Sequence, residues 1–213
     1  MPGDLRLALR VFEAALAYSL DSGLEDELAW QRSTCFASFT ESDLLREGAW
    51  VILCSGFREA IVRRVFDHIS LSFCDWESAE LIVGQSSLCQ QAAMASFRNE
   101  RKLRALCQMA ELIHSSGFAS FKAEVLRQPI ATLRSLPYIG PITAMHLAKN
   151  LGFDVAKPDR HLVRLTEWLG YTCAAELCNE ISSETGEQVR TVDLLLWRFM
   201  ADVRPSSRQD LVA

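Results

Sequence analysis

One aspartate in this sequence stands where a carboxylate can take part in chemistry. Asp159 follows Pro158 and precedes an apolar run with helical spacing that includes Leu162 and Trp168. This position favours a helix N-cap, in which the carboxylate accepts hydrogen bonds from amides of the first turn. A carboxylate at the positive end of a helix dipole can also stabilise a carbon centre that becomes cationic and orient water towards it. Capping and catalysis are therefore both open to Asp159, and they are compatible.

A second feature, before Asp159, could bind an anion. The turn Leu136-Pro137-Tyr138-Ile139-Gly140 follows a short predicted helix, and Pro141 opens the next helix, where its missing N–H does no harm. Such a hairpin leaves the amides from Gly140 to Thr143 unpaired and pointing outward, which suits a phosphate group. Glycine at 140 lets a phosphate approach without a side chain in the way, although a purely structural turn glycine would look the same.

Taken together, residues 133–169 resemble the helix-hairpin-helix GPD superfamily of base-excision DNA glycosylases. The resemblance rests on the LPxxG hairpin, on Thr143 and Ala144 in the helix after it, and on an aspartate 19 residues after the hairpin glycine. It is extended by His161 and Arg164, which follow that aspartate. A weaker resemblance covers residues 41–75, which end in Phe73-Cys74-Asp75.

The resemblance implies a role for each part of the motif. Asp159 would face a nucleotide flipped out of double-stranded DNA and help to detach its base, leaving an abasic site. The hairpin would grip the DNA backbone, through the positions Leu136, Tyr138, Ile139, Gly140, Ile142 and Thr143. A monovalent cation, Na⁺ or K⁺, could bind the main-chain carbonyls of Arg134, Leu136 and Ile139. No organic cofactor is required.

The sequence departs from the bifunctional members of that superfamily, which use a lysine to attack the sugar. The position two residues after Gly140, where they carry this lysine, is Ile142 here. A water-using enzyme without lyase activity is therefore expected. Lys157 is the alternative nucleophile, since an extended segment could turn its side chain to the same side as that of Asp159. Some members of the superfamily bind an iron–sulfur cluster through four cysteines near the C-terminus. Only Cys173 and Cys178 lie there in this sequence, so no cluster is expected.

Base flipping also needs residues that fill the gap in the duplex and residues that hold the base. Phe57 and Arg58, in a polar break between two predicted helices, are candidates for the wedge, unless Phe57 is a core residue and Arg58 is solvated. Three further candidates for DNA contact follow Pro158 and Asp159, namely Arg160, His161 and Arg164. For His161, the alternative is a structural role. The candidates for the base pocket combine aromatic rings, which could stack on the base, with carboxylates or an amide, which could recognise its edge. They are Glu27, Trp30, Gln31, Glu47 and Trp50. For the two tryptophans, the alternative is packing in the core.

The elements that must position these residues are predicted to be helices, because apolar residues recur at intervals of three and four and little of the chain alternates. We expect an all-α, two-lobed fold. One lobe spans about 41–165, with the helix-hairpin-helix at about 129–151 and the catalytic aspartate, and the second combines 1–40 with 166–213. The substrate nucleotide is expected to enter between the lobes. Thr40 or Ser42 should cap a helix that reaches Cys54, and Asp75 a short helix that ends at Val83.

Composition excludes some classes of protein and leaves DNA binding open. The net charge of −5 is unusual for a protein that covers many phosphates, but a local basic patch would suffice. The seven cysteines show no CxxC spacing and are expected to be reduced core thiols. No apolar run approaches the length of a membrane span. We expect an intracellular monomer, which in a bacterium would be cytoplasmic and nucleoid-associated.

Two other functions are compatible with the sequence. The chain could be a non-catalytic helix-hairpin-helix DNA-binding protein in which Asp159 only caps a helix. It could also be a defence enzyme that removes modified bases from phage DNA rather than a repair enzyme, because the sequence does not name the base.

Overall fold

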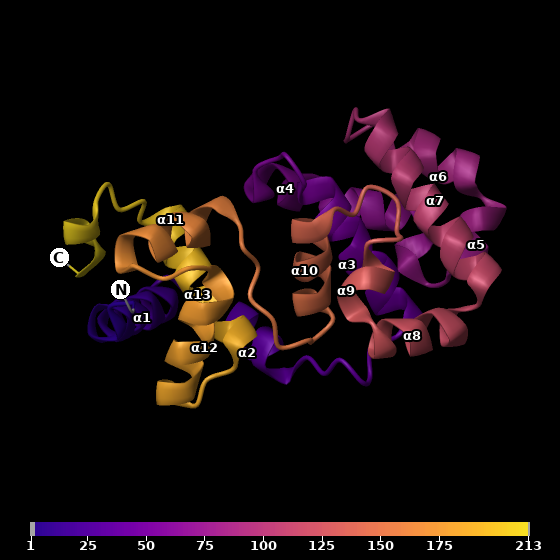
Figure 1. Cartoon of the computed structure of the whole chain (residues 1–213). Helices are drawn as coiled ribbons and strands as arrows, with labels where there is room; N and C mark the ends of the chain where they lie inside the picture. Colours follow the sequence, from indigo (N-terminus) through magenta and orange to yellow (C-terminus); the bar gives the residue numbers. More distant parts are fainter. Residues whose placement is uncertain (1–2, 213) are drawn as a thin grey trace. The chain divides into compact units, whose positions relative to one another are not determined.

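The computed structural model describes residues 3–212, and all regular secondary structure in that range is helical. The chain divides into two compact units, shown in Figure 1. We call residues 35–151 the hairpin unit, and residues 1–34 with 152–213 the terminal unit. None of the described helices is long and apolar enough to cross a lipid bilayer.

The hairpin unit consists of eight α-helices and one 3₁₀ turn among its described residues. They are α3 (Glu41–Cys54), α4 (Glu59–Ser72), η1 (Cys74–Trp76), α5 (Ala79–Gly84), α6 (Ser86–Ala93), α7 (Glu100–Ser116), α8 (Phe118–Arg127), α9 (Pro129–Leu133) and α10 (Pro141–Asn150). Helix α3 packs against α4, α7 and α10, and α9 packs against α8 and α10. The hairpin between α9 and α10 is therefore supported by α3 and α8.

Capping residues explain where two of these helices begin. Thr40 caps α3 and forms a reciprocal capping box with Asp43. Of the two residues expected to cap this helix, Thr40 and Ser42, the structure therefore selects Thr40. Asp75 does not cap the next helix, contrary to expectation. It lies in η1 with a φ of 49°, and Ser78 caps α5 instead by accepting from the amide of Leu81. The reason is that Phe73 and Trp76 stack on each other and draw the segment around Asp75 into a tight turn.

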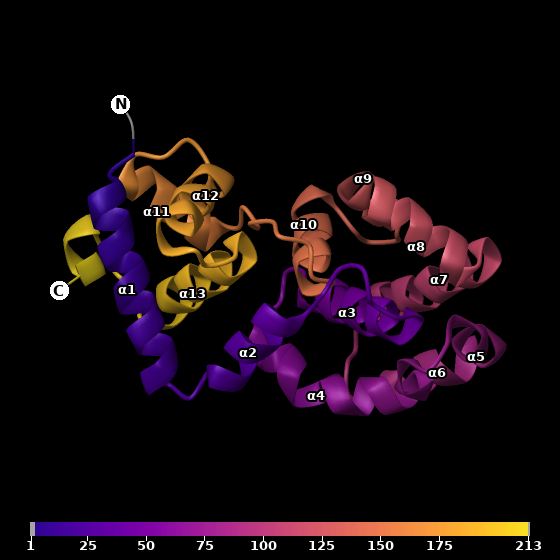
Figure 2. The same ribbon diagram turned by 90° about the horizontal axis from the view of Figure 1, so that it is seen from below.

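The terminal unit is built around one helix from the C-terminal part of the chain. Its elements are α1 (Leu5–Asp21), α2 (Glu25–Ser33), α11 (Arg160–Leu169), α12 (Ala174–Thr185), α13 (Val189–Asp202) and η2 (Arg208–Val212). Helix α13 contacts α1, α2, α11 and α12, and Figure 2 shows α1 running alongside it. Both ends of the sequence thus contribute to one folded unit.

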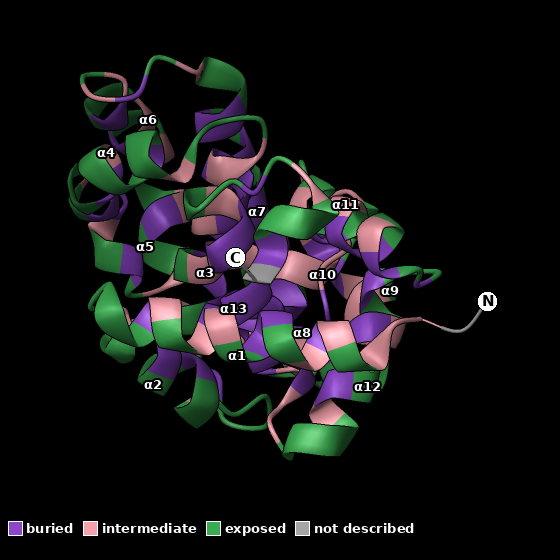
Figure 3. Ribbon diagram, turned by 90° about the vertical axis from the view of Figure 1, so that its left-hand side faces the viewer, coloured by how far each residue is buried: buried purple, intermediate pink, exposed green. Residues whose placement is uncertain are grey.

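Each helix buries one side, as the helical spacing of apolar residues predicts. In Figure 3 the buried residues form bands along the helices and the exposed residues lie on their other sides. The core of the terminal unit includes Leu162, Leu165 and Leu169 from α11, together with Leu195 and Leu196 from α13. Because α11 supplies three leucines to this core, it folds with the terminal segments.

The boundary between the units therefore differs from the expected one. We predicted that residues 152–165 belong with the hairpin and residues 35–40 with the terminal segments. The structure instead assigns residues 152–165 to the terminal unit and residues 35–40 to the hairpin unit. Asp159 and the hairpin consequently lie in different units. Spacing along the sequence could not show this, because the deciding interaction is the packing of α11 against α12 and α13.

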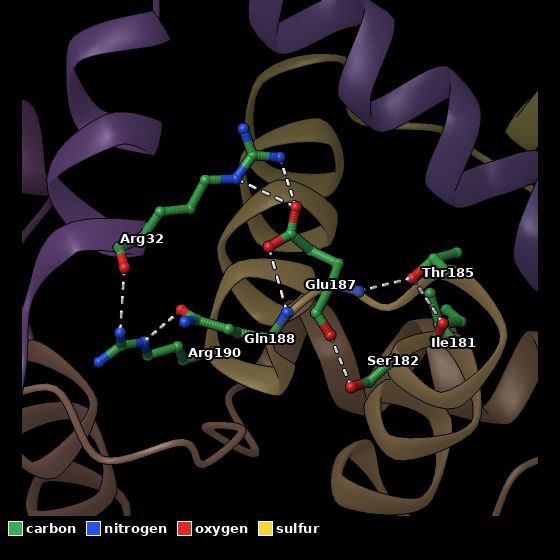
Figure 4. A network of polar contacts seen from close by, with 7 residues as sticks. All are labelled: Arg32, Ile181, Ser182, Thr185, Glu187, Gln188 and Arg190. Atoms are coloured by element: carbon green, nitrogen blue, oxygen red, sulfur yellow. Dashed lines mark hydrogen bonds and ion pairs between the residues drawn. The ribbon is translucent and has the colours of Figure 1, made fainter.

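A polar network joins α2 to the start of α13 within the terminal unit (Figure 4). Arg32 forms an ion pair with Glu187, and the main-chain oxygen of Glu187 accepts from Ser182 at 2.6 Å. Arg190 donates to Gln188 at 2.9 Å and to the carbonyl of Arg32 at 3.4 Å. This network holds the first turn of α13 in place, and the segment before Asp159 depends on that turn.

Candidate functional site

The two carboxylate oxygens of Asp159 have different partners. Oδ1 accepts hydrogen bonds from the amides of His161, at 2.9 Å, and Leu162, at 3.2 Å, and so caps α11. Oδ2 lies 3.2 Å from Nζ of Lys157. The side chain is 17% exposed, so it is neither sealed in the core nor fully solvated. One oxygen therefore fixes the orientation of the carboxylate, and the other pairs with the ammonium of Lys157.

Lys157 is held in the same small group of side chains. Its side chain is 11% exposed, and Nζ lies 5.3 Å from the ring centroid of Trp197 on α13. The extended segment places Lys157 and Asp159 on one side, as the alternation of an extended chain predicts. Trp197 also contacts His161 edge to face, with ring centroids 6.4 Å apart. Sequence reasoning missed Trp197, whose only signal was its place in an otherwise apolar helix.

Helix α13 positions the segment that leads to Asp159. The buried carboxylate of Asp193 accepts from the amide of Lys157 at 2.7 Å. Asp154 accepts from the amide of Arg190 at 2.9 Å, and the Arg190 guanidinium donates to the carbonyl of Gly152. These bonds attach both ends of residues 152–157 to α13. Asp159 is thus presented by a segment with defined geometry.

The three candidate DNA contacts after Asp159 all lie in the first turns of α11. Arg160 is exposed and donates to the ring of His161 at 3.3 Å, and the Arg164 guanidinium lies 5.0 Å from the centroid of Trp168. Burial lowers the pKa of His161, more than the opposing effect of Asp159 raises it. His161 is therefore neutral at pH 7, and the positive charge here comes from Lys157 and the two arginines.

In the hairpin, one amide that was expected to be unpaired has a partner. The amide of Gly140 donates to Oγ1 of Thr143 at 2.6 Å, which corrects that expectation; the threonine closes a capping arrangement at the start of α10. Pro141 has no amide hydrogen. The amides of Ile142 and Thr143 lie in the first turn, where helical geometry supplies no carbonyl partner. An anion at this helix end would therefore meet two amides, those of Ile142 and Thr143, rather than three.

The hairpin exposes two of its six candidate residues as apolar side chains. Tyr138 and Ile142 are each 48% exposed, whereas Leu136 and Ile139 are buried and anchor the turn. Tyr138 has a φ of 67°, in the left-handed region that costs a residue with a side chain about 1–2 kcal/mol. A strained, exposed tyrosine is costly to the fold, which favours a role in binding.

The main-chain carbonyls suggested for a monovalent cation have suitable chemistry. Neutral carbonyl oxygens are ligands that alkali cations accept, and the carbonyl of Leu136 uses one of its two lone pairs for the amide of Ile139 at 3.2 Å. The second lone pair of Leu136 and the carbonyls of Arg134 and Ile139 would form the site. The cation stays a prediction.

The candidate wedge loop is exposed and has an unexpected neighbour. Phe57 is 40% exposed and Arg58 is exposed at the start of α4, so neither is a core residue. Nζ of Lys102, a residue that is only 1% exposed, lies 4.7 Å from the Phe57 ring centroid. Sequence reasoning missed Lys102, although a lysine beside Leu103 and Leu106 on an apolar helix side was a usable signal.

The five candidates for the base pocket do not form one group in either unit. Glu27, Trp30 and Gln31 lie on α2 of the terminal unit, whereas Glu47 and Trp50 lie on α3 of the hairpin unit. Glu27 pairs with Arg198 at 2.7 Å, and Glu47 accepts a hydrogen bond from Asn150 at 2.8 Å. Gln31 is buried, Trp30 is 41% exposed, and Trp50 packs on Phe66. These contacts hold Glu27, Glu47 and Trp50 in place, and the role of the five residues in a base pocket stays a prediction.

The cysteines differ in burial more than the sequence suggested. All seven are free thiols, but only Cys89, Cys107 and Cys178 are buried. Burial raises the pKa of the Cys107 thiol to about 11 and that of Cys89 to about 12. Among the described residues, no group of three or more His, Cys, Asp or Glu side chains could hold a metal ion.

Comparisons with known proteins bear on the fold. No protein-family model matches the chain, and no curated protein matches it. Among solved structures, it is similar to an 8-oxoguanine glycosylase/lyase from Methanocaldococcus jannaschii, crystallised with a 15mer DNA containing 8-oxoguanine. The TM-score is 0.59 at 18% identity, over 91% of this chain and 96% of the other. The chain has a helix-hairpin-helix glycosylase-like fold. At this identity, the likeness shows the fold alone.

Proposed function

We propose that this protein is a DNA N-glycosylase that hydrolyses the bond between a damaged or modified base and its deoxyribose. The observation that carries the proposal is Asp159, whose Oδ1 is held by two amides of α11 while Oδ2 lies beside a cationic side chain at a partly exposed position. The glycosylase-like fold and the hairpin support it.

The chemistry follows from the carboxylate. As the C1′–N bond of the flipped nucleotide breaks, its electron pair leaves with the base and positive charge develops on the sugar. The Asp159 carboxylate would stabilise that charge and orient water, whose oxygen bonds to C1′. One proton from the water would pass to the carboxylate and one proton from solvent would neutralise the base. The capping bonds limit reorientation of the carboxylate during this step.

The remaining residues would bind DNA. The amides of Ile142 and Thr143 would contact a backbone phosphate, and a Na⁺ or K⁺ at the hairpin carbonyls would add positive charge there. Lys157, Arg160 and Arg164 would meet phosphates near the flipped nucleotide. A phosphate that binds Lys157 would draw its ammonium away from Oδ2, which would then be available to the sugar.

Replacement of Asp159 tests the proposal. Asp159→Asn should lower the rate of base release about 10²–10³-fold, since it removes a charge that stabilises the transition state, and should leave DNA affinity within about twofold. The wild type and variant would be incubated with a panel of damaged and modified DNAs, including 8-oxoguanine and bulky modified cytosines. Released bases would be identified by mass spectrometry, and DNA affinity measured by fluorescence anisotropy.

Asp4→Asn is a matched control. Asp4 also caps a helix, by accepting from the amide of Leu7 at 3.1 Å, and asparagine is as good an N-cap as aspartate. Asp4→Asn should therefore release bases at the wild-type rate. If the wild type releases no base from any DNA on the panel but binds DNA, the protein is a binding module and Asp159 is only a cap.

A lyase that acts through Lys157 is the second candidate, favoured by the 3.2 Å separation of Nζ and Oδ2. Transfer of a proton from the ammonium to Asp159 would free the amine to attack C1′ and displace the base, which would leave with the electron pair of the glycosidic bond and take up a proton. Loss of a proton from the attached nitrogen and opening of the sugar ring, with O4′ protonated as its bond to C1′ breaks, would then give the Schiff base. We favour hydrolysis, because Ile142 occupies the position of the lysine in the bifunctional enzymes that the hairpin resembles.

Borohydride trapping separates the two mechanisms. Incubation with abasic DNA and sodium borohydride should give no covalent protein–DNA adduct from the wild type under conditions in which a lysine-bearing glycosylase/lyase is trapped. An adduct that forms with the wild type and is lost in Lys157→Met would establish the lyase and overturn the hydrolytic mechanism.

A further inference from the structure

Two exposed aromatic rings in the hairpin unit share one buried cation. Phe57 comes from the loop between α3 and α4, and Tyr138 from the hairpin before α10. Their ring centroids lie 4.7 Å and 5.5 Å from Nζ of Lys102, which belongs to α7. Two loops that are 81 positions apart in the sequence are therefore tied to the same ammonium group.

The ammonium is fixed by main-chain oxygens. Nζ donates to the carbonyls of Ile52, at 2.6 Å, and Leu53, at 2.7 Å, and to that of Ser55. These carbonyls lie at and just after the end of α3, where helical geometry leaves oxygens without amide partners. Lys102 thereby satisfies the end of α3 and sets the direction in which the chain enters the Phe57 loop. An ammonium has three donors, and all three are used.

Both rings are held in positions that are unfavourable for the fold, Tyr138 by its backbone conformation and Phe57 by its exposure. Tyr138 adopts a left-handed φ of 67°, which glycine would adopt freely. Phe57 remains 40% exposed although it contacts Phe97 on one side, with centroids 5.3 Å apart. Exposed aromatic faces next to a cation are suited to stacking on nucleic-acid bases.

We propose that Lys102 is a positioning residue that couples the Phe57 loop to the hairpin, so that Phe57 and Tyr138 form one surface that stacks on unstacked bases of duplex DNA. This inference rests on the proposed DNA binding and adds to it a residue that does not touch DNA. Burial lowers the pKa of Lys102 to about 8, so the ammonium carries its charge at neutral pH.

A double-mutant cycle tests the coupling without altering Lys102. Phe57→Ala and Tyr138→Gly would be measured singly and together, by fluorescence anisotropy with a labelled duplex that contains a tetrahydrofuran abasic-site analogue. Each single substitution should weaken binding about tenfold. The affinity of the double variant should fall by clearly less than the product of the two single losses. The reason is that loss of one ring leaves the other without its partner surface. Additive effects would overturn the proposal.

Tyr138→Gly carries a second readout that a structural role would not produce. Because relief of the left-handed strain outweighs the greater freedom that glycine gives the unfolded chain, the melting temperature should rise while DNA affinity falls. If stability and affinity fall together, Tyr138 serves the fold and the proposal fails.

Lys102→Met provides the direct test, with Lys122→Met as the matched control. Lys122 makes the same kinds of contact elsewhere in the unit: Nζ donates to the carbonyl of Phe39 at 2.6 Å and lies 4.8 Å and 5.9 Å from the rings of Phe39 and Phe118. Lys102→Met should weaken binding to the abasic duplex about tenfold and abolish the coupling between Phe57 and Tyr138. Lys122→Met should bind within about twofold of the wild type.

The outcomes separate this inference from the proposed function. If the wild type does not bind the duplex, the proposed function fails. If the wild type binds and both methionine variants bind equally well, DNA binding stands and the role of Lys102 is refuted. If Lys102→Met does not fold, the cycle between Phe57 and Tyr138 decides the matter alone.

Discussion

At the scale of single residues, the question is which positions are set by the fold and which by a ligand. Asp159 serves both, because Oδ1 caps α11 and Oδ2 faces Lys157. Gly140 is a clearer case. Its φ of −91° and ψ of −176° suit any residue, and an added Cβ would meet only Oγ1 of Thr143, at 3.7 Å. The backbone conformation does not require glycine there, in agreement with the proposal that a phosphate approaches this position.

Gly140→Ala should therefore separate stability from binding. The melting temperature should stay the same or rise, because alanine reduces the freedom of the unfolded chain by about 0.4–1 kcal/mol. DNA affinity should fall about tenfold, the loss expected when a hydrogen bond to a charged phosphate is disturbed. Calorimetry and anisotropy would measure the two effects. Gly84→Ala, where the added Cβ meets nothing within 4 Å, is the control and should bind normally. Equal affinity of both variants would contradict the ligand explanation.

At the scale of elements, the hairpin depends on the helices behind it. Glu47 on α3 accepts a hydrogen bond from Asn150, the last residue of α10, at 2.8 Å. Burial raises the pKa of Glu47, more than the bond from Asn150 lowers it. Well above this raised pKa, Glu47 is ionised, and its buried charge destabilises the folded protein. The hydrogen bond to Asn150, which joins α3 to α10, offsets only part of this cost.

Glu47→Gln should consequently stabilise the hairpin unit at pH 7.5. Glutamine keeps an acceptor for Asn150 and removes the buried charge, so the free energy of unfolding should rise by about 1 kcal/mol, or about 2–4 °C in melting temperature. The gain should shrink as the pH falls towards the raised pKa, because wild-type Glu47 then takes up a proton and loses its charge as well. Thermal melts at pH 7.5 and pH 5 would show this. A lower melting temperature at pH 7.5 would mean that the charge of Glu47 is needed for the fold.

At the scale of the whole molecule, the acidic net charge is distributed unevenly. The hairpin unit has 12 lysines and arginines and 11 aspartates and glutamates, a net charge of +1, whereas the terminal unit has 10 and 16, a net charge of −6. The hairpin therefore belongs to a unit whose formal charge is close to neutral. In the terminal unit, the positive side chains around Asp159 must act locally, at distances shorter than the screening length of about 8–10 Å.

Several features of the protein could be determined from the sequence because they depend on residues close together in the chain. The helical periodicity, the Thr40 cap, the LPxxG hairpin with its proline-initiated helix and the N-cap position of Asp159 are all local. Each is decided by interactions within about four residues, which a single sequence displays directly.

Only the tertiary structure decided which of these local elements belong together. It placed α11 and Asp159 with the terminal segments, turned the segment at Asp75 into a tight turn rather than a helix cap, and separated the five base-pocket candidates onto two units. It also brought Lys102 against two loops and Trp197 against Lys157. These outcomes follow from packing and hydrogen bonding between residues that are tens of positions apart, and the energy of such contacts has no periodic pattern in the sequence.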